Sequence, residues 1–246
     1  MRTAICFSGE LRTFDVAMPL IMQYFNNIQA DVFCHTWNKS GDVEHNQLHE
    51  AHVKAIVRNS HHNFITLKVQ PSINHSGPFG NMLYSIQAAN RLKRDYEIAN
   101  NFDYDCVIKT RYDMLMPPHS TWKNDNVEPR TLYYSLGNRG LVHTDVGKHG
   151  LSDIIFWGDS PSMDIACDTY RYYNWVVFPT YLQLMQGNSI DPGDSMLSPG
   201  TLIYQQTERR NIKLQQVQTM LQETLWRTTV DKLDPVTQFE EIKKAY

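Results

Sequence analysis

The chain has 246 residues, of which 41% are hydrophobic and 20% are charged, and its formal net charge at pH 7 is −3. This composition is typical of a folded globular chain and excludes a wholly disordered one. Because the chain carries no overall positive charge, binding of nucleic acid by bulk electrostatics is disfavoured, and any anionic ligand must be held locally.

The first part of the sequence alternates strand and helix patterns. Thr3–Ser8 is an apolar run that predicts a buried strand and is closed by Gly9. Phe14–Ile28 has apolar residues at helical spacing, and Asp31–Trp37 predicts a second strand. This order favours two parallel strands joined by a right-handed crossover.

The middle of the sequence continues this pattern after a polar segment. A weak helical pattern over Leu48–Val57 is followed by a predicted strand at Ile65–Val69. We expect a loop over Ser72–Gly80, which holds a proline and two glycines, and the longest helix over Asn81–Asn100. Cys106–Lys109 predicts the next buried strand.

The last part of the sequence is less regular. Thr131–Leu136 and Asp153–Trp157 predict two further strands, and Ser162–Tyr173 and Pro199–Arg210 predict helices. Together these patterns predict an α/β fold, a single domain over residues 1–214 with a mixed, mainly parallel sheet flanked by helices. We expect residues 215–246 to form a helical or irregular extension packed on that domain.

The cysteines and the apolar runs indicate in which cellular compartment the protein is expected. The four cysteines are widely spaced and form no CxxC pair, so we interpret them as reduced core residues of a cytoplasmic protein. No stretch approaches the roughly 20 apolar residues that cross a membrane, so no membrane span is expected.

A histidine-rich segment raises the possibility of a zinc site. The histidines of this segment are His45, His49, His52, His61 and His62. The segment has no HExxH motif and no neighbouring cysteine, so a solvated polar face is the favoured interpretation.

Two segments that follow predicted strands carry unusual chemistry. In open α/β sheets, ligands bind outside the carboxyl ends of the strands. After the first strand, Ser8 and Gly9 offer backbone amides to a phosphate, and Arg12 adds a planar cation. The segment has no GxGxxG or GxxxxGK[ST] fingerprint, so it is equally compatible with an ordinary strand-to-helix turn.

The second segment, CVIKTRYDM, ends a buried strand with Arg111, Tyr112 and Asp113. One interpretation is an ion pair that fixes the loop. In the other, Asp113 binds a divalent cation that bridges the phosphates of a nucleotide, and Arg111 contacts the diphosphate or holds the aspartate. No nucleic-acid partner is expected in either case.

Three motifs in this order, ICFSGELRTF, KTRYDM and LSDIIFWGDSPSM, resemble those of glycosyltransferases from polysaccharide gene clusters and large DNA viruses, including the rhamnosyltransferase domain of chlorella viruses. The resemblance covers roughly residues 2–163. It implies a GT-A fold with a Rossmann-like sheet that binds a nucleotide-sugar, and a DxD-type motif that carries Mn²⁺ or Mg²⁺. Arg111 stands where that motif has its first acid, so Asp113 alone matches the metal ligand.

The same resemblance implies the other site residues and the partners. Phe7, Ser8, Gly9 and Arg12 would line the nucleotide site. The partners would be a nucleoside-diphosphate sugar and a glycan acceptor, in the cytoplasm of the cell or of a viral host.

An inverting transferase also needs a carboxylate that deprotonates the acceptor hydroxyl. Asp153 is the first candidate, although it is equally suited to capping a turn, and Asp191 and Asp194 are second-choice bases or acceptor-site residues. Two alternatives remain open. A sugar nucleotidyltransferase typically has a longer first loop that contains lysine, unlike SGELR, and a non-catalytic nucleotide- or glycan-binding module would keep the site without turnover.

Overall fold

The computed structural model describes residues 1–40, 43–44, 47–73, 77–114, 116, 121–123, 126–135, 154–177 and 199–217. The strands of its main sheet are β1 (Thr3–Ser8), β2 (Ala30–Trp37), β5 (Asn63–Gln70), β6 (Cys106–Thr110), β7 (Thr131–Ser135), β8 (Phe156–Gly158) and β9 (Lys213–Val217). The helices are α1 (Phe14–Tyr24), α2 (Gln47–Asn59), α3 (Gly77–Asn100), α4 (Ser160–Cys167), α5 (Thr169–Tyr172) and α7 (Pro199–Arg209), with a π-helical turn at Tyr173–Val177. A two-stranded hairpin pairs β3 (Lys39–Ser40) with β4 (Val43–Glu44).

The main sheet has seven strands in the order β5-β2-β1-β6-β8-β7-β9. The first four are parallel to one another, whereas β8 runs antiparallel to both β6 and β7. Strand β9 is parallel to β7 at the edge. The predicted mixed, mainly parallel sheet flanked by helices is therefore confirmed, and its arrangement is compatible with a Rossmann-like fold.

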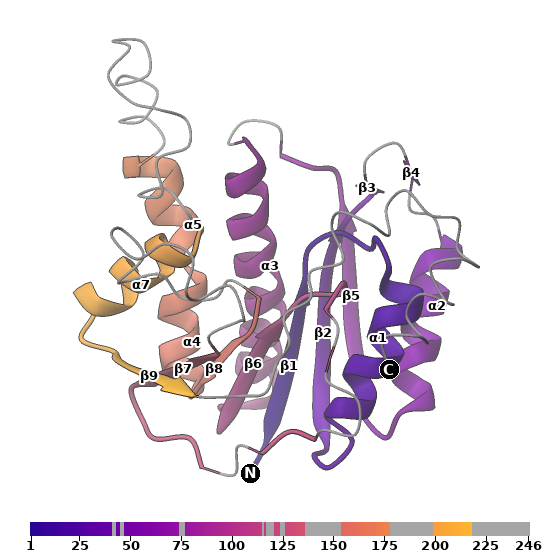
Figure 1. The fold of residues 1–246 in the computed structure, drawn as a ribbon, viewed down its shortest axis with the longest axis horizontal. Coiled ribbons are helices and arrows are strands. Elements are labelled where there is room, and N and C mark those ends of the chain that lie inside the picture. Colours follow the sequence, from indigo (N-terminus) through magenta and orange to yellow (C-terminus); the bar gives the residue numbers. More distant parts are fainter. Residues whose placement is uncertain are drawn as a thin grey trace.

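Helices cover both faces of the sheet (Figure 1). Successive side chains of a strand point to opposite faces, so Ile5 and Phe7 share a core with α1 and α2, while Ala4 and Cys6 share one with α3, α4 and α7. Because both faces are covered, β1 is buried throughout, and its apolar residues Ala4–Phe7 do not alternate with polar ones.

The order in which successive strands join the sheet reverses at β1. The chain first adds β2 and β5 on one side of β1, with α1 and α2 on one face. It then returns through α3 on the other face and adds β6 on the opposite side of β1. The carboxyl ends of β1 and β6 therefore form a topological switch point, which is where ligands bind in open α/β sheets.

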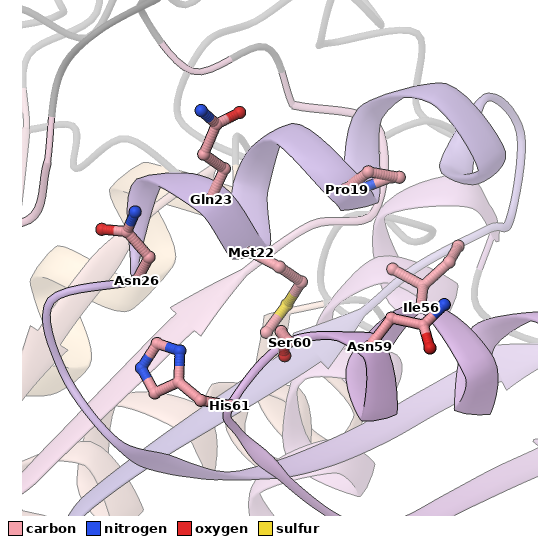
Figure 2. Close-up of a pocket in the computed structure, with 8 residues that line it drawn as sticks. All are labelled: Pro19, Met22, Gln23, Asn26, Ile56, Asn59, Ser60 and His61. Carbon is pink, nitrogen blue, oxygen red and sulfur yellow. The ribbon is translucent and has the colours of Figure 1, made fainter.

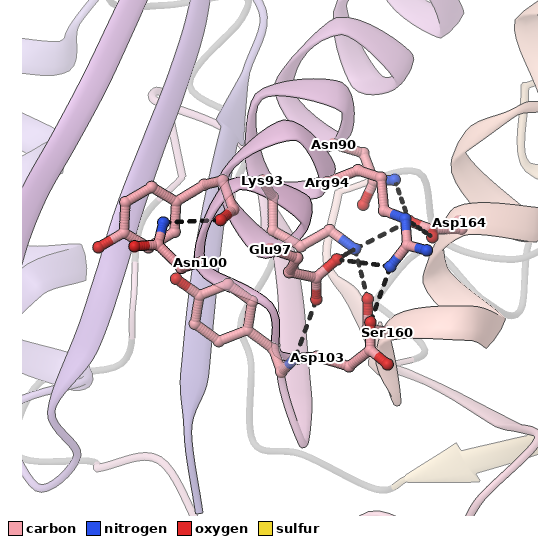
Figure 3. A network of polar contacts seen from close by, with 10 residues as sticks. Asn90, Lys93, Arg94, Glu97, Asn100, Asp103, Ser160 and Asp164 are labelled. Carbon is pink, nitrogen blue, oxygen red and sulfur yellow. Dashed lines mark hydrogen bonds and ion pairs between the residues drawn. The ribbon is translucent and has the colours of Figure 1, made fainter.

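A buried ionic network joins α3 to α4 (Figure 3). The Lys93 ammonium lies 3.0 Å from Glu97 and 2.8 Å from Asp164, and it donates to the Ser160 hydroxyl at 2.5 Å. Burial by itself lowers the pKa of Lys93, but Asp164 and Glu97 outweigh that effect and the pKa is raised. Lys93 is therefore charged, and the network holds the two helices in register.

Several predicted boundaries were wrong. The expected loop over Ser72–Gly80 contains the first turn of α3, because Pro78 stands near the helix start, where its missing N–H is not needed. The predicted helix Ser162–Tyr173 is divided between α4, α5 and the π-helical turn. The hydroxyl of Thr169 donates to the Ala166 carbonyl at that division.

The expected boundary after residue 214 lies inside β9, so residues 215–217 belong to the sheet. Residues 218–246 lie outside the described residues. All four cysteines are free and buried, as predicted for core residues. Within the part of the chain that is described, no helix has the length and apolar character needed to cross a membrane.

Candidate functional site

Two loops with polar chemistry leave the sheet side by side. Phe7 pairs with Thr110 in the register of β1 and β6, so the residues that follow each strand begin at neighbouring positions. We call the segments Ser8–Arg12 and Arg111–Asp113 the strand-end loops. The sequence predicted that both belong to one site, and the register of the two strands places them together.

Gly9 gives the first strand-end loop its shape. Its φ angle is +121°, a conformation that side chains with a Cβ rarely adopt. A Cβ added here would meet no atom of the described residues within 4 Å, so the Cα of Gly9 faces open space. A ligand can therefore approach the backbone closely at this point, although the Gly9 N–H itself donates to the Ser85 hydroxyl at 2.8 Å and not toward a ligand.

Arg111 and Asp113 form a two-pronged ion pair in the second strand-end loop. The Arg111 Nε and Nη2 atoms donate to the two carboxylate oxygens of Asp113 at 2.7 and 2.6 Å. Their side chains are only 12% and 8% exposed. This geometry is that of the loop-fixing ion pair, one of the two interpretations left open by the sequence, and it also presents a guanidinium at the switch point.

Each arginine of the strand-end loops has its own carboxylate. Arg12 Nε lies 2.8 Å from the Glu10 carboxylate, in a pair about one third exposed. The two arginines, with Glu10 and Asp113, carry no net charge together. A diphosphate bound here would add negative charge that these balanced pairs do not neutralise, so additional positive charge would stabilise it.

A divalent cation would supply that charge, and Asp113 was predicted to bind it. Among the described residues, no group of three or more histidine, cysteine or acidic side chains is placed to hold a metal. Asp113 therefore belongs to no larger ligand cluster among the described residues, and both of its carboxylate oxygens accept hydrogen bonds from Arg111. This carboxylate fits Mg²⁺ or Mn²⁺ only where phosphate oxygens and water complete the coordination, as is usual for nucleotide-bound magnesium.

Phe7 does not line the site with its side chain. Its ring is fully buried and stacks on the ring of Tyr112, with centroids 5.4 Å apart. Tyr112 is also fully buried, and its hydroxyl donates to the backbone carbonyl of His35 at 3.3 Å. These two rings form an apolar support beneath the strand-end loops. The predicted contact between Phe7 and a nucleotide is therefore corrected to a supporting role.

The three aspartates proposed for catalysis and acceptor binding, Asp153, Asp191 and Asp194, lie outside the described residues. The residue after Asp153 is described: the backbone carbonyl of Ile154 accepts a hydrogen bond from the buried Lys109 ammonium at 3.4 Å. Lys109 lies one residue before the end of β6. It therefore ties Ile154 to the strand that precedes Arg111.

Sequence reasoning missed three buried polar residues: Ser85 and His35 bond to the strand-end loops, and Lys109 bonds to Ile154. Ser85 on α3, His35 on β2 and Lys109 on β6 are all almost fully buried. A signal was present for two of them, because His35 and Lys109 interrupt otherwise apolar strands. Ser85 had no such signal, since its contact with Gly9 arises only when α3 packs on β1.

His49 and His52 of the histidine-rich segment lie near the start of α1, whereas a cavity among the described residues lies at the opposite end of that helix. His49 and His52 pack against Phe14, with ring centroids 6.3 and 5.2 Å away. A cavity of about 410 Å³ lies between the last turns of α1 and α2 (Figure 2). It is lined by Pro19, Met22, Gln23, Asn26, Ile56, Asn59, Ser60 and His61. These turns precede β2 and β5, so the cavity adjoins the amino ends of the strands and is not the candidate site.

Comparison with known proteins does not assign the chain to a family. No protein-family model matches the sequence, and no curated protein matches it significantly. The functional interpretation therefore depends on the chemistry of the strand-end loops and on the motifs of the sequence.

Proposed function

We propose that this chain is a glycosyltransferase that moves a sugar from a nucleoside-diphosphate sugar to a glycan acceptor, on a GT-A-type variant of the observed sheet. The observation that carries the proposal is the pairing of Phe7 with Thr110. This pairing puts Gly9, whose Cα faces open space, next to the Arg111–Asp113 pair at the switch point. The order of the three sequence motifs supplies the further step from nucleotide binding to sugar transfer.

In this proposal the arginines receive the diphosphate. A guanidinium has five N–H donors, and Arg111 directs two of them to Asp113. Asp113 thereby orients the Arg111 fork, and Arg12 on the neighbouring loop provides a second cation. Mn²⁺ or Mg²⁺ held between Asp113 and the phosphates would neutralise charge on the departing diphosphate.

The chemical step needs one proton acceptor on the acceptor side. Asp153 is the proposed base: it takes the proton of the acceptor hydroxyl while that oxygen bonds to the anomeric carbon of the donor sugar. The bond from that carbon to the diphosphate oxygen breaks, and the nucleoside diphosphate leaves with the electron pair. Asp191 and Asp194 are proposed to contact the acceptor.

Titration calorimetry with UDP, GDP and dTDP, each with and without Mn²⁺, tests the binding half of the proposal. We expect the wild type to bind at least one of them, and more tightly with Mn²⁺. Asp113→Asn should weaken that binding about tenfold or more, because it loses a charged partner of Arg111 and of the cation. Asp105→Asn is the matched control, since Asp105 precedes the amino end of the same strand and accepts from the Arg2 backbone N–H. Equal nucleotide affinity in the wild type and in Asp113→Asn contradicts the assignment.

A panel of nucleotide-sugars, assayed for donor hydrolysis and for transfer, tests the catalytic half. Asp153→Asn should keep nucleotide binding and lower turnover by about a hundredfold or more. Full turnover in that variant removes Asp153 from the mechanism. Formation of a nucleotide-sugar from a sugar phosphate identifies a nucleotidyltransferase, and nucleotide binding without any turnover identifies a binding module.

A further inference from the structure

The amide of Gly9 is held by a residue from another part of the chain. Gly9 follows β1, and its N–H donates to the hydroxyl of Ser85 on α3 at 2.8 Å. The two residues are 76 positions apart in the sequence. Because the Ser8–Gly9 peptide is planar, this bond fixes both the N–H of Gly9 and the opposed carbonyl of Ser8. It therefore sets the direction in which the first strand-end loop leaves the sheet.

Ser85 is itself held by His35. The His35 Nδ1 atom lies 2.8 Å from the Ser85 oxygen, and both residues are fully buried. Burial lowers the pKa of His35 to about 4, and the Gln70 side chain offsets only part of that effect, so the ring is neutral near pH 7. A serine hydroxyl donates once and can accept twice. An arrangement that gives the Ser85 O–H an acceptor has Gly9 N–H donating to Ser85 and the Ser85 O–H donating to Nδ1 of His35, with the ring proton on Nε2.

His35 also supports the second strand-end loop. Its backbone carbonyl accepts from the Tyr112 hydroxyl at 3.3 Å, and Tyr112 lies between Arg111 and Asp113. The Tyr112 ring stacks in turn on Phe7 of β1. One residue of β2 thus connects to both strand-end loops, to the first through Ser85 and to the second through Tyr112.

We propose that Ser85, oriented by His35, is a positioning residue that holds the first strand-end loop in the conformation that binds the diphosphate of the donor. This inference rests on the proposed function, because it assumes that the loops bind a nucleoside diphosphate. Ser85 and His35 do not act as a nucleophile and base, since neither side chain reaches the surface. Their effect on the ligand passes through the backbone of Gly9.

The test compares nucleotide affinity with folding stability in four variants. UDP, GDP and dTDP are titrated in the presence of Mn²⁺, and the melting temperature of each variant is measured alongside. Ser85→Ala should weaken nucleotide binding about tenfold, equal to about 1.4 kcal/mol. Ser85→Thr restores a hydroxyl and should recover most of that affinity. Ser85→Cys keeps the size but offers only a weak acceptor, so it should resemble Ser85→Ala.

Thr207→Ala is the control for a merely structural effect. Thr207 is a fully buried hydroxyl on α7 that donates to the Ile203 carbonyl within its own helix. Its loss should lower the melting temperature and leave nucleotide affinity unchanged. If Ser85→Ala does not fold, Ser85→Cys and Ser85→Thr supply the same comparison. Hydrogen–deuterium exchange at the Gly9 amide, measured without nucleotide, should be faster in Ser85→Cys than in Ser85→Thr.

The outcomes separate this inference from the proposed function. A wild type that binds none of the three nucleotides overturns the proposed function, and this inference with it. Wild-type binding that Ser85→Ala and Ser85→Cys leave within twofold overturns this inference alone. So does a loss of affinity that Ser85→Thr fails to recover while its melting temperature stays at the wild-type value.

Discussion

Replacing Lys93 by methionine tests whether its buried ion pairs stabilise the packing of α3 against α4. The substitution removes two ion pairs, at 3.0 and 2.8 Å, and a hydrogen bond to Ser160. Glu97, whose side chain has no exposed surface, would then be buried without its main counter-charge. Removing one partner of a buried pair costs about 3–5 kcal/mol, because the remaining charge stays desolvated.

The structure favours the lower end of that range. Glu97 keeps a hydrogen bond from the backbone N–H of Tyr104 at 2.9 Å, and Arg94 remains 3.3 Å from it. We therefore expect Lys93→Met to lower the free energy of unfolding by about 3 kcal/mol. For a chain of this size that corresponds to a fall of about 6–12 °C in melting temperature.

Differential scanning calorimetry and urea unfolding measure this change, and a second substitution identifies its cause. Adding Glu97→Gln removes the stranded charge but keeps an oxygen for the Tyr104 N–H, so the double variant should recover at least about 1 kcal/mol. Lys213→Met is the control, because the Lys213–Glu128 pair is more than half exposed and should not measurably affect melting. A Lys93→Met variant that melts like Lys213→Met, or a double variant less stable than either single one, refutes the reasoning.

Two further predictions concern buried titratable groups. Burial lowers the pKa of His35 from 6.5 to about 4, so the unfolded chain binds this proton more readily than the folded one. The free energy of unfolding should fall by about 3 kcal/mol as the pH drops from about 6.5 to about 4. His35→Asn should remove this part of the pH dependence in urea unfolding at several pH values, and an unchanged profile contradicts it. The four buried thiols should not react with Ellman's reagent in the native protein, because burial raises the pKa of Cys34, Cys106 and Cys167 to about 12. All four should react in denaturant. Rapid labelling of the native protein would argue against that burial.

Local patterns identified most elements of this fold. The sequence predicted β1, β2 and β6 because strands covered on both faces consist mostly of apolar residues. The alternation of strands and helices in the first half then indicated a parallel sheet, and the loss of that alternation indicated an antiparallel addition. The predicted helix boundaries were less accurate where proline or small residues allow more than one local structure, as at the start of α3 and between α4 and α5.

The sequence predicted which segments form the candidate site but not the contacts within it. The motifs pointed to both strand-end loops, because Gly9 and the Arg111–Asp113 pair are unusual residues immediately after apolar strands. The sequence could not choose between a metal ligand and an ion pair for Asp113, since both use the same residues at the same spacing. The family resemblance also placed Phe7 at the ligand, although that ring is fully buried and stacks on Tyr112.

By itself the sequence determined which segments become buried strands and which loops carry charge, because those properties depend on neighbouring residues. The tertiary structure alone decided that β1 and β6 are neighbours, that Ser85 holds the amide of Gly9, and that His35 connects to both loops. These contacts join residues dozens of positions apart, and the packing of helices on the sheet selects them. No local pattern records that packing, because it is a property of the whole folded chain.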